Sequence, residues 1–112
     1  MKNLEQIRAK NALSANIGTG KEGGESVAKK VPAMIIENGF LGAFAFAVET
    51  GKGYLDVFNA IVSHLIEVGL VPPTKRTYGH FCEIDANTLR AVTAEAMAFL
   101  NYLRRLAKAS KE

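Results

Sequence analysis

The sequence predicts an all-α protein: a compact bundle of five to six helices around a buried central helix, with no β-sheet. Apolar residues recur at helical spacing in several segments. The most apolar stretch, residues 31–48, has only two strongly polar side chains, Glu37 and Asn38, directly before Gly39. Because Asn-Gly is typical of a helix end, this stretch predicts two helices joined by a tight corner. A length of 112 residues, of which 48% are hydrophobic and 22% charged, predicts a single domain over residues 1–112.

The N-terminal part of the chain predicts one helix followed by a glycine-rich loop. The helix covers Lys2–Asn16 with an imperfect apolar stripe, and Arg8 and Lys10 lie off that stripe. The loop, GTGKEGGES at residues 18–26, has the glycine spacing of a dinucleotide-binding site. Such a site needs a strand before the loop, and here a helix precedes it. We therefore interpret the loop as a connector that binds no cofactor.

Two central helices are expected over Ser26–Asn38 and Phe40–Thr50. Lys29 and Lys30 lie off the apolar stripe of the first helix, so both should face outward. Pro32 predicts either a kink or the first residue of a new helix. The second helix is apolar nearly all round through Val48, which predicts central burial. Its uninterrupted apolar run is far shorter than the roughly 20 residues that span a membrane. The stripe of the first helix consists of Val27, Val31, Met34 and Ile35.

The next predicted helix, Tyr54–Val68, has the clearest separation of apolar and polar faces, and Gly69 ends it. His64 lies at the border of the two faces. His64 and Glu67 are one helical turn apart, as two metal ligands would be. A di-metal bundle also needs further carboxylates and a second such pair on facing helices, and the chain contains no Glu-x-x-His. We expect a surface or interface histidine and no metal.

Leu70–Ile84 is predicted to be a long connection, because Pro72 and Pro73 block a helix. Its basic and aromatic residues suit two alternatives. In one, the basic residues bind phosphates and the aromatic rings stack on bases. In the other, the aromatic rings tuck into the core while the basic residues are solvated. We favour the second. The residues concerned are Lys75, Arg76, Tyr78, His80 and Phe81.

The last predicted helix, Ala86–Ser110, begins after Asp85, a good N-cap residue. Its apolar side should face the core. The opposite arc holds basic residues that cover about 27 Å at 1.5 Å per residue, enough to follow several phosphates. The helix dipole also favours basic residues in a last turn, but that does not explain Arg90. Met97 lies among the basic residues, and an exposed thioether suits a contact with a neighbouring protein subunit. The basic row includes Arg90, Arg104, Arg105 and Lys108.

Positive charge is concentrated at both ends of the chain. Residues 1–30 hold six Lys/Arg and three Glu, residues 31–74 one Lys and four Asp/Glu, and residues 75–112 seven Lys/Arg and four Asp/Glu. The net charges are therefore +3, −3 and +3. Positive surface of this kind binds phosphate backbones without reading sequence. The single Cys82 forms no intramolecular disulfide, and the first residues lack the apolar core of a signal peptide. We expect a cytoplasmic protein.

Three stretches carry a resemblance to a known family. They are LEQIRAKNAL at residues 4–13, VPAMIIENGFLGAFAFAV at residues 31–48 and TAEAMAFLNYLRRLAKA at residues 93–109. In this order they resemble the small all-helical subunit of the type III-B (Cmr) CRISPR RNA-guided effector complex. The chain departs from the family pattern at Phe40, where leucine is common, and at Tyr102, where tryptophan is expected. Both exchanges keep a large, mainly apolar side chain at that position.

The resemblance implies a non-catalytic subunit that acts in antiviral defence. In that family, copies of the small subunit stack beside the crRNA-holding backbone and line the channel for target RNA, while RNA cutting is attributed to backbone subunits. The partners implied are the other Cmr subunits, crRNA and target RNA, and further copies of the chain, with no membrane. Our candidates for RNA contact, chosen by charge and outward direction, are Arg8, Lys29, Lys30, Arg90, Arg104, Arg105 and Lys108.

The sequence gives less support to three other functions. A DNA-binding dimer would use the helix after the Asn-Gly corner, which is too apolar to enter a groove. A purely structural scaffold that makes only protein contacts would have the same helices. An enzyme has no support, because the carboxylates are scattered and no nucleophile–base pair is identifiable.

Overall fold

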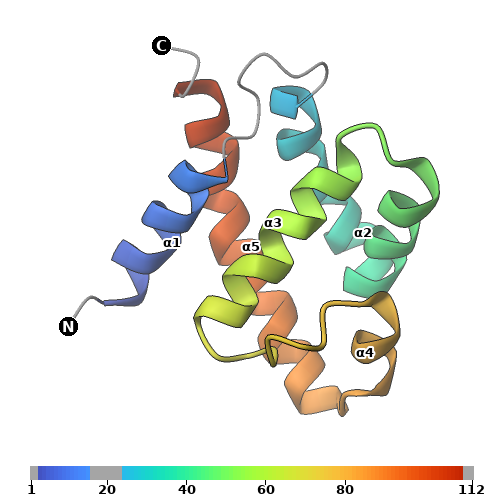
Figure 1. The fold of residues 1–112 in the computed structure, drawn as a ribbon. Helices are drawn as coiled ribbons and strands as arrows, with labels where there is room; N and C mark the ends of the chain where they lie inside the picture. Colours follow the sequence, from blue (N-terminus) through green and yellow to red (C-terminus); the bar gives the residue numbers. More distant parts are fainter. Residues whose placement is uncertain (1–2, 16–23, 110–112) are drawn as a thin grey trace.

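The computed structural model describes residues 3–15 and 24–109, without the side chains of residues 24–26 and 107–109. Within these residues it contains five helices and no strand, so the predicted all-α class is confirmed (Figure 1). The helices are α1 (Leu4–Ser14), α2 (Gly24–Thr50), α3 (Tyr54–Glu67), α4 (Tyr78–Glu83) and α5 (Ala86–Ala109). The glycine-rich loop and the predicted start of the first helix at Lys2 lie outside the described residues, apart from the backbone of residues 24–26.

Helix α2 bends at Gly39, as the Asn-Gly corner predicts. Gly39 has φ 80° and ψ 164°, whereas the residues on either side are helical. This backbone region is open to glycine and strained for other residues. Pro32 lies inside the first half of α2, and Gly39 is the one non-helical residue recorded within the helix. The two halves of α2 therefore run in different directions, and each half presents its own face to the core.

One apolar core joins α2, α3 and α5. The predicted stripes of α3 and α5 face it, and Phe58 and Phe99 are fully buried. At its centre the ring of Phe44 stacks on that of Phe58, with centroids 4.9 Å apart. Asp85 caps α5 as predicted, because its Oδ1 accepts a hydrogen bond from the Thr88 backbone N–H at 2.7 Å.

The expectation that Phe40–Val48 is buried on all sides is wrong. Phe40 and Phe44 are buried, but Phe46 is 41% exposed and Val48 is 52% exposed. The second half of α2, green in Figure 1, lies at the edge of the molecule and packs on one side only. Its outer side therefore remains apolar and uncovered.

Residues 27–50 of α2 have the length and apolar composition of a membrane-crossing helix. The sequence analysis counted a shorter run, because it separated the two halves at Gly39. The inner faces of both halves belong to the core shared with α3 and α5. About a third of the apolar window, 33%, is buried inside the structure, and the rest of the helix surface is not fully covered by the described chain.

The prediction that Leu70–Ile84 contains no helix is also wrong, because α4 forms within it. Its formation follows from two aromatic residues one helical turn apart. Phe81 is buried against Phe40, with ring centroids 5.4 Å apart, and the Tyr78 hydroxyl donates a hydrogen bond to the Leu41 carbonyl at 3.0 Å. This burial stabilises a helix too short to form alone, and it confirms the favoured alternative, in which the rings tuck into the core.

Candidate functional site

The outer side of α5 carries a row of exposed arginines. Arg90 donates a hydrogen bond to the side-chain oxygen of Asn87, and Arg104 donates one to Asn101 Oδ1 at 3.3 Å. Both acceptors are neutral amides three residues earlier on the same helix. These neutral acceptors orient the two guanidinium groups along α5, and the charge of Arg90 also acts on the exposed carboxylate of Asp85 at the start of the helix. Arg105 is exposed beside Arg104, and the side chain of Lys108 lies outside the described part of the chain.

Two lysines of α2 face outward near the same row. Lys29 and Lys30 are both exposed, as predicted from the apolar stripe. The blue start of α2 and the red end of α5 lie at the same end of the molecule (Figure 1), so the first half of α2 runs antiparallel to α5. Lys29 and Arg104 border the same space between the two helices, although 75 positions separate them in the sequence.

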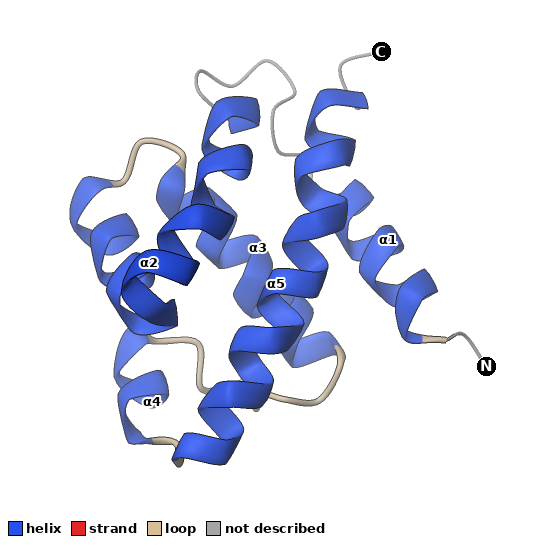
Figure 2. Ribbon diagram, turned by 180° about the vertical axis from the view of Figure 1, so that it is seen from behind, coloured by secondary structure: helices blue, strands red, loops and turns tan. Residues whose placement is uncertain are grey.

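A groove of about 580 Å³ runs between the first half of α2 and α5. The two helices lie side by side on the near side of Figure 2. Lys29 and Arg104 line its basic end, and Ile36 and Met97 line its apolar end. Ile36 is 75% exposed. Met97 is half-buried and packs against the core, so it is less exposed than its place in the basic row suggests.

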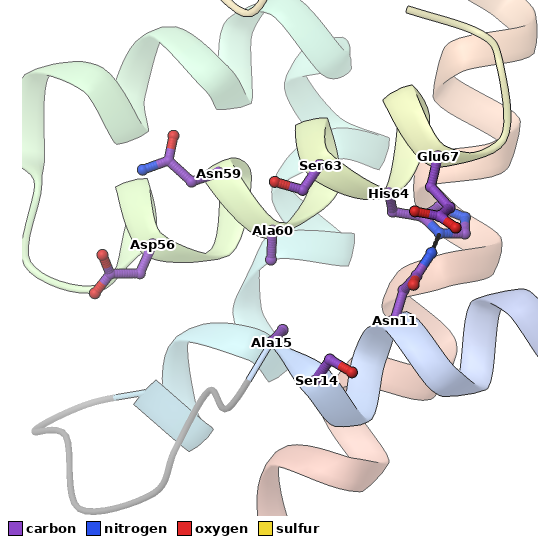
Figure 3. Close-up of a pocket in the computed structure, with 9 residues that line it drawn as sticks. All are labelled: Asn11, Ser14, Ala15, Asp56, Asn59, Ala60, Ser63, His64 and Glu67. Atoms are coloured by element: carbon purple, nitrogen blue, oxygen red, sulfur yellow. Dashed lines mark hydrogen bonds between the residues drawn. The ribbon is translucent and has the colours of Figure 1, made fainter. Parts of the chain in front are cut away.

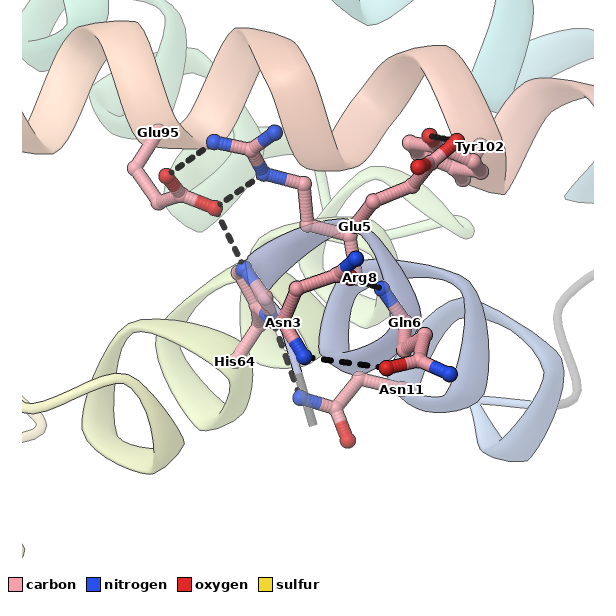
Figure 4. Close-up of polar contacts among 8 residues, drawn as sticks. All are labelled: Asn3, Glu5, Gln6, Arg8, Asn11, His64, Glu95 and Tyr102. Carbon is pink, nitrogen blue, oxygen red and sulfur yellow. Dashed lines mark hydrogen bonds and ion pairs between the residues drawn. The ribbon is translucent and has the colours of Figure 1, made fainter. Parts of the chain in front are cut away.

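Arg8, one of the RNA-contact candidates, points inward toward α5 (Figure 4). Its Nε lies 2.7 Å from Glu95 Oε2 and its NH2 lies 2.8 Å from Oε1. This two-point geometry is the strongest form of an Arg–carboxylate contact. The Arg8 guanidinium holds the pKa of Glu95 below its ordinary value, the hydrogen bond with His64 acts in the same direction, and burial opposes both. Glu95 in turn raises the pKa of Arg8.

His64 also belongs to this polar cluster. The expectation of a surface or interface histidine is wrong, because His64 is buried by the described part of the chain. The residue is 1% exposed, with Nε2 2.8 Å from Glu95 Oε2 and Nδ1 2.9 Å from Asn11 Nδ2. Because an amide nitrogen only donates, Nδ1 accepts, and the ring proton lies on Nε2 facing the carboxylate. The ring also stacks on Phe99, with centroids 4.5 Å apart.

The family is decided by a comparison over almost the whole chain. The sequence model of the CRISPR-associated protein family Cas_Cmr5 matches residues 4–110. The chain belongs to the Cas_Cmr5 family. It is therefore the small helical subunit of the type III-B Cmr complex, as the three quoted stretches implied. No curated protein and no solved structure matched the chain.

Within this Cas_Cmr5 subunit, a second, polar cavity of about 380 Å³ separates α1 from α3. Figure 3 shows His64 and Glu67 at one end of the cavity and Asp56 at the other. Among the described residues, no group of three His, Cys, Asp or Glu side chains is placed to hold a metal ion. Both ring nitrogens of His64 already have protein partners. The His64–Glu67 pair therefore has no ring nitrogen to offer a metal.

The basic residues before α4 lie apart from the groove. Lys75 and Arg76 are exposed, and Arg76 donates a hydrogen bond to the Ser63 hydroxyl at 2.8 Å. His80 packs edge-on against the ring of Phe81. The aromatic rings of this segment therefore serve the core, and the stacking surface that base binding would need is not assembled from them.

The sequence analysis missed Glu95, the centre of the buried polar cluster. A signal was available, since Glu95 lies between Val92 and Phe99 on the apolar side of α5. A carboxylate in such a stripe is rarely buried unless it is paired. Its partners on α1 and α3 have no sequence relation to it, and only the fold brings them together.

Proposed function

We propose that this Cas_Cmr5 subunit is a non-catalytic, cytoplasmic component of antiviral defence that lines the target-RNA channel. Several copies stack along the crRNA-bound backbone of the Cmr complex, in contact with its other subunits. Each copy presents cations from α2 and α5 to the RNA. The contacts go to phosphates, so they stabilise the guide–target duplex without reading its sequence.

One observation carries the RNA-lining proposal: the recorded hydrogen-bond acceptors of Arg90 and Arg104 are asparagine amides. A guanidinium held by a neutral amide keeps its charge for a phosphate, whereas one held by a carboxylate loses much of its attraction for an anion. By the same criterion we leave Arg8 out of the RNA-facing set, because Glu95 holds it at two points. The other candidates, chosen by charge and outward direction in the sequence, stay in the proposal: Lys29, Lys30, Arg90, Arg104, Arg105 and Lys108.

The test is the salt dependence of target-RNA binding by the complete complex. Complexes assembled with an Arg90→Gln, Arg105→Gln subunit should bind target RNA more weakly, with a shallower slope of log affinity against log salt. The slope should fall by about 0.7–0.9 for each phosphate that the variant no longer neutralises. Lys10→Gln is the matched control, because Lys10 is an exposed cation on α1 outside the candidate set. Equal slopes for all three complexes would refute RNA lining.

The alternative is a purely structural subunit, and the exposed apolar residues Ile36 and Phe46 favour it. Such a subunit would contribute protein contacts alone. It predicts that the double variant assembles normally and binds RNA with an unchanged salt slope, so the same experiment decides between the two functions.

A further inference from the structure

The uncovered side of the second half of α2 has a definite chemical order. Gly42, Ala45, Phe46 and Glu49 are exposed and follow helical spacing along one row. The Phe46 ring packs edge-on against Tyr54, with centroids 5.1 Å apart, which fixes the ring in position. The row therefore presents a small-residue section, then a fixed aromatic ring, and then a carboxylate one turn later.

The groove between α2 and α5 has the complementary order. Its apolar end is formed by Ile36 and Met97, and its basic end by Lys29 and Arg104. Seven residues separate Ile36 from Lys29, which corresponds to about 10 Å along a helix. Gly42 and Glu49 are also seven residues apart. Alanines line the middle of the groove, at Ala33 and Ala98, and their short side chains allow a close approach.

We propose that the second half of α2 of one copy docks in the α2–α5 groove of the next copy. This inference rests on the proposed stacking of copies and names the two surfaces that make the stack. Gly42 lies against Ile36 and Met97, the Phe46 ring lies over the short side chains of Ala33 and Ala98, and Glu49 faces Lys29 and Arg104. An amphipathic helix in an apolar groove is a common mode of recognition, and the charge pair sets its direction.

The two surfaces lie on different sides of one molecule. The second half of α2 forms the right-hand edge of Figure 1, whereas α5 and the first half of α2, which line the groove, lie on the near side of Figure 2. A contact between unlike surfaces leaves one of each free at the ends, so addition of copies continues in one direction. Lys29 and Arg104 then belong to the junction between copies, so within a stack the observation that supports RNA lining is the one at Arg90. Lys30, Arg90 and Arg105 are exposed away from the groove lining and remain for the RNA.

Cross-linking within the assembled complex tests the contact. In a Cys82→Ser background, one population of the subunit carries Glu49→Cys and a second carries Arg104→Cys. Complexes assembled from the mixture, treated with a short bismaleimide, should give a covalent dimer of the subunit. Either population alone should give none, and a subunit carrying both cysteines should give a ladder of dimers and longer products.

Charge exchange provides an independent readout in the isolated subunit. Sedimentation at increasing concentration should show self-association at least tenfold weaker for Glu49→Arg, with recovery when Arg104→Glu is added. Phe46→Ser should weaken association, and Val48→Ser is its control. Val48 is exposed on the same helix about 100° or more around it from Phe46 and Glu49. Circular dichroism should show unchanged folding for both.

Several results would overturn the docking contact. These are a dimer from the Glu49→Cys population alone, a cross-link from position 49 to a different subunit, or no cross-link in complexes whose native mass shows more than one copy. A native mass with a single copy would overturn the stacking itself. None of these results depends on RNA, so RNA lining stands or falls separately on the salt slope.

Discussion

Arg8 on α1 and Glu95 on α5 form a two-point ion pair across 87 positions of sequence, with N–O distances of 2.7 and 2.8 Å. The pair joins a helix that has little apolar burial of its own. Ala12 is the one buried residue recorded for α1, while Leu4 is 42% and Leu13 59% exposed. A further hydrogen bond joins the Tyr102 hydroxyl to Glu5 at 3.2 Å. Polar contacts therefore fix the position of α1 on the bundle.

Replacement of Glu95 by leucine should destabilise the protein strongly. It leaves the His64 Nε2–H buried without an acceptor and removes the partner of Arg8, and breaking a buried pair costs about 3–5 kcal/mol. Urea unfolding followed by circular dichroism measures the loss. In a double-mutant cycle with Arg8→Met, the combined loss should be smaller than the sum of the two single losses. Strict additivity would show that the two side chains do not interact in solution.

Acid should weaken the protein through the same carboxylate. The pKa of Glu95 is lowered in the folded state by Arg8 first, and also by His64. Its contribution to stability is therefore complete above the ordinary glutamate pKa of about 4.3, and is lost as the pH falls through the lower folded pKa. Urea midpoints measured from pH 7 to pH 3 should fall for the native chain and fall less for Glu95→Gln.

The carboxylate of Asp85 also contributes to the loss of stability at acid pH, so its effect needs a separate control variant. Its pKa is lowered chiefly by the hydrogen bond from the Thr88 backbone N–H. Asp85→Asn keeps an N-cap acceptor but removes the titration. The residual acid sensitivity of Glu95→Gln should decrease further in the double variant with Asp85→Asn, and an unchanged pH profile in both variants would contradict the two assignments.

The fold was largely predictable from sequence because it depends on local patterns. Helical apolar spacing located α3 and α5, the Asn-Gly dipeptide located the bend at Gly39, and Asp85 located the start of α5. The polar cluster was not predictable in this way. Arg8 looked like an outward cation and His64 like a surface residue, because their shared partner Glu95 comes from a distant helix.

The outer side of α2 could not be predicted for a different reason. An all-round apolar segment indicates burial, but the sequence does not say whether the same chain or a neighbour covers it. The structure buries Phe44 and leaves Phe46 open. The prediction of a fully buried helix thus failed at Phe46, which we assign to the contact between copies, and at Val48, which lies outside that contact.

Substitution of Gly39 by alanine should destabilise the bend without any steric clash. An alanine Cβ would meet no atom within 4 Å, but φ of 80° with ψ of 164° is a region that L-residues rarely occupy. The expected loss is about 1–3 kcal/mol from backbone strain alone. Gly79→Ala in α4 is the control, since its Cβ would lie 3.9 Å from the nearest atom and φ is not positive. It should be neutral or stabilise by up to about 1 kcal/mol.

Arg8 and Arg105 should separate structural from RNA-facing cations. Both are arginines on outer helices, but Glu95 holds Arg8, whereas Arg105 is exposed. Arg8→Gln should lower the urea midpoint of the isolated subunit and leave the salt slope of target-RNA binding by the assembled complex unchanged. Arg105→Gln should leave the urea midpoint unchanged and make that slope shallower, because fewer counterions are released when the RNA binds. The reverse pattern would place Arg8 at the RNA and remove Arg105 from it.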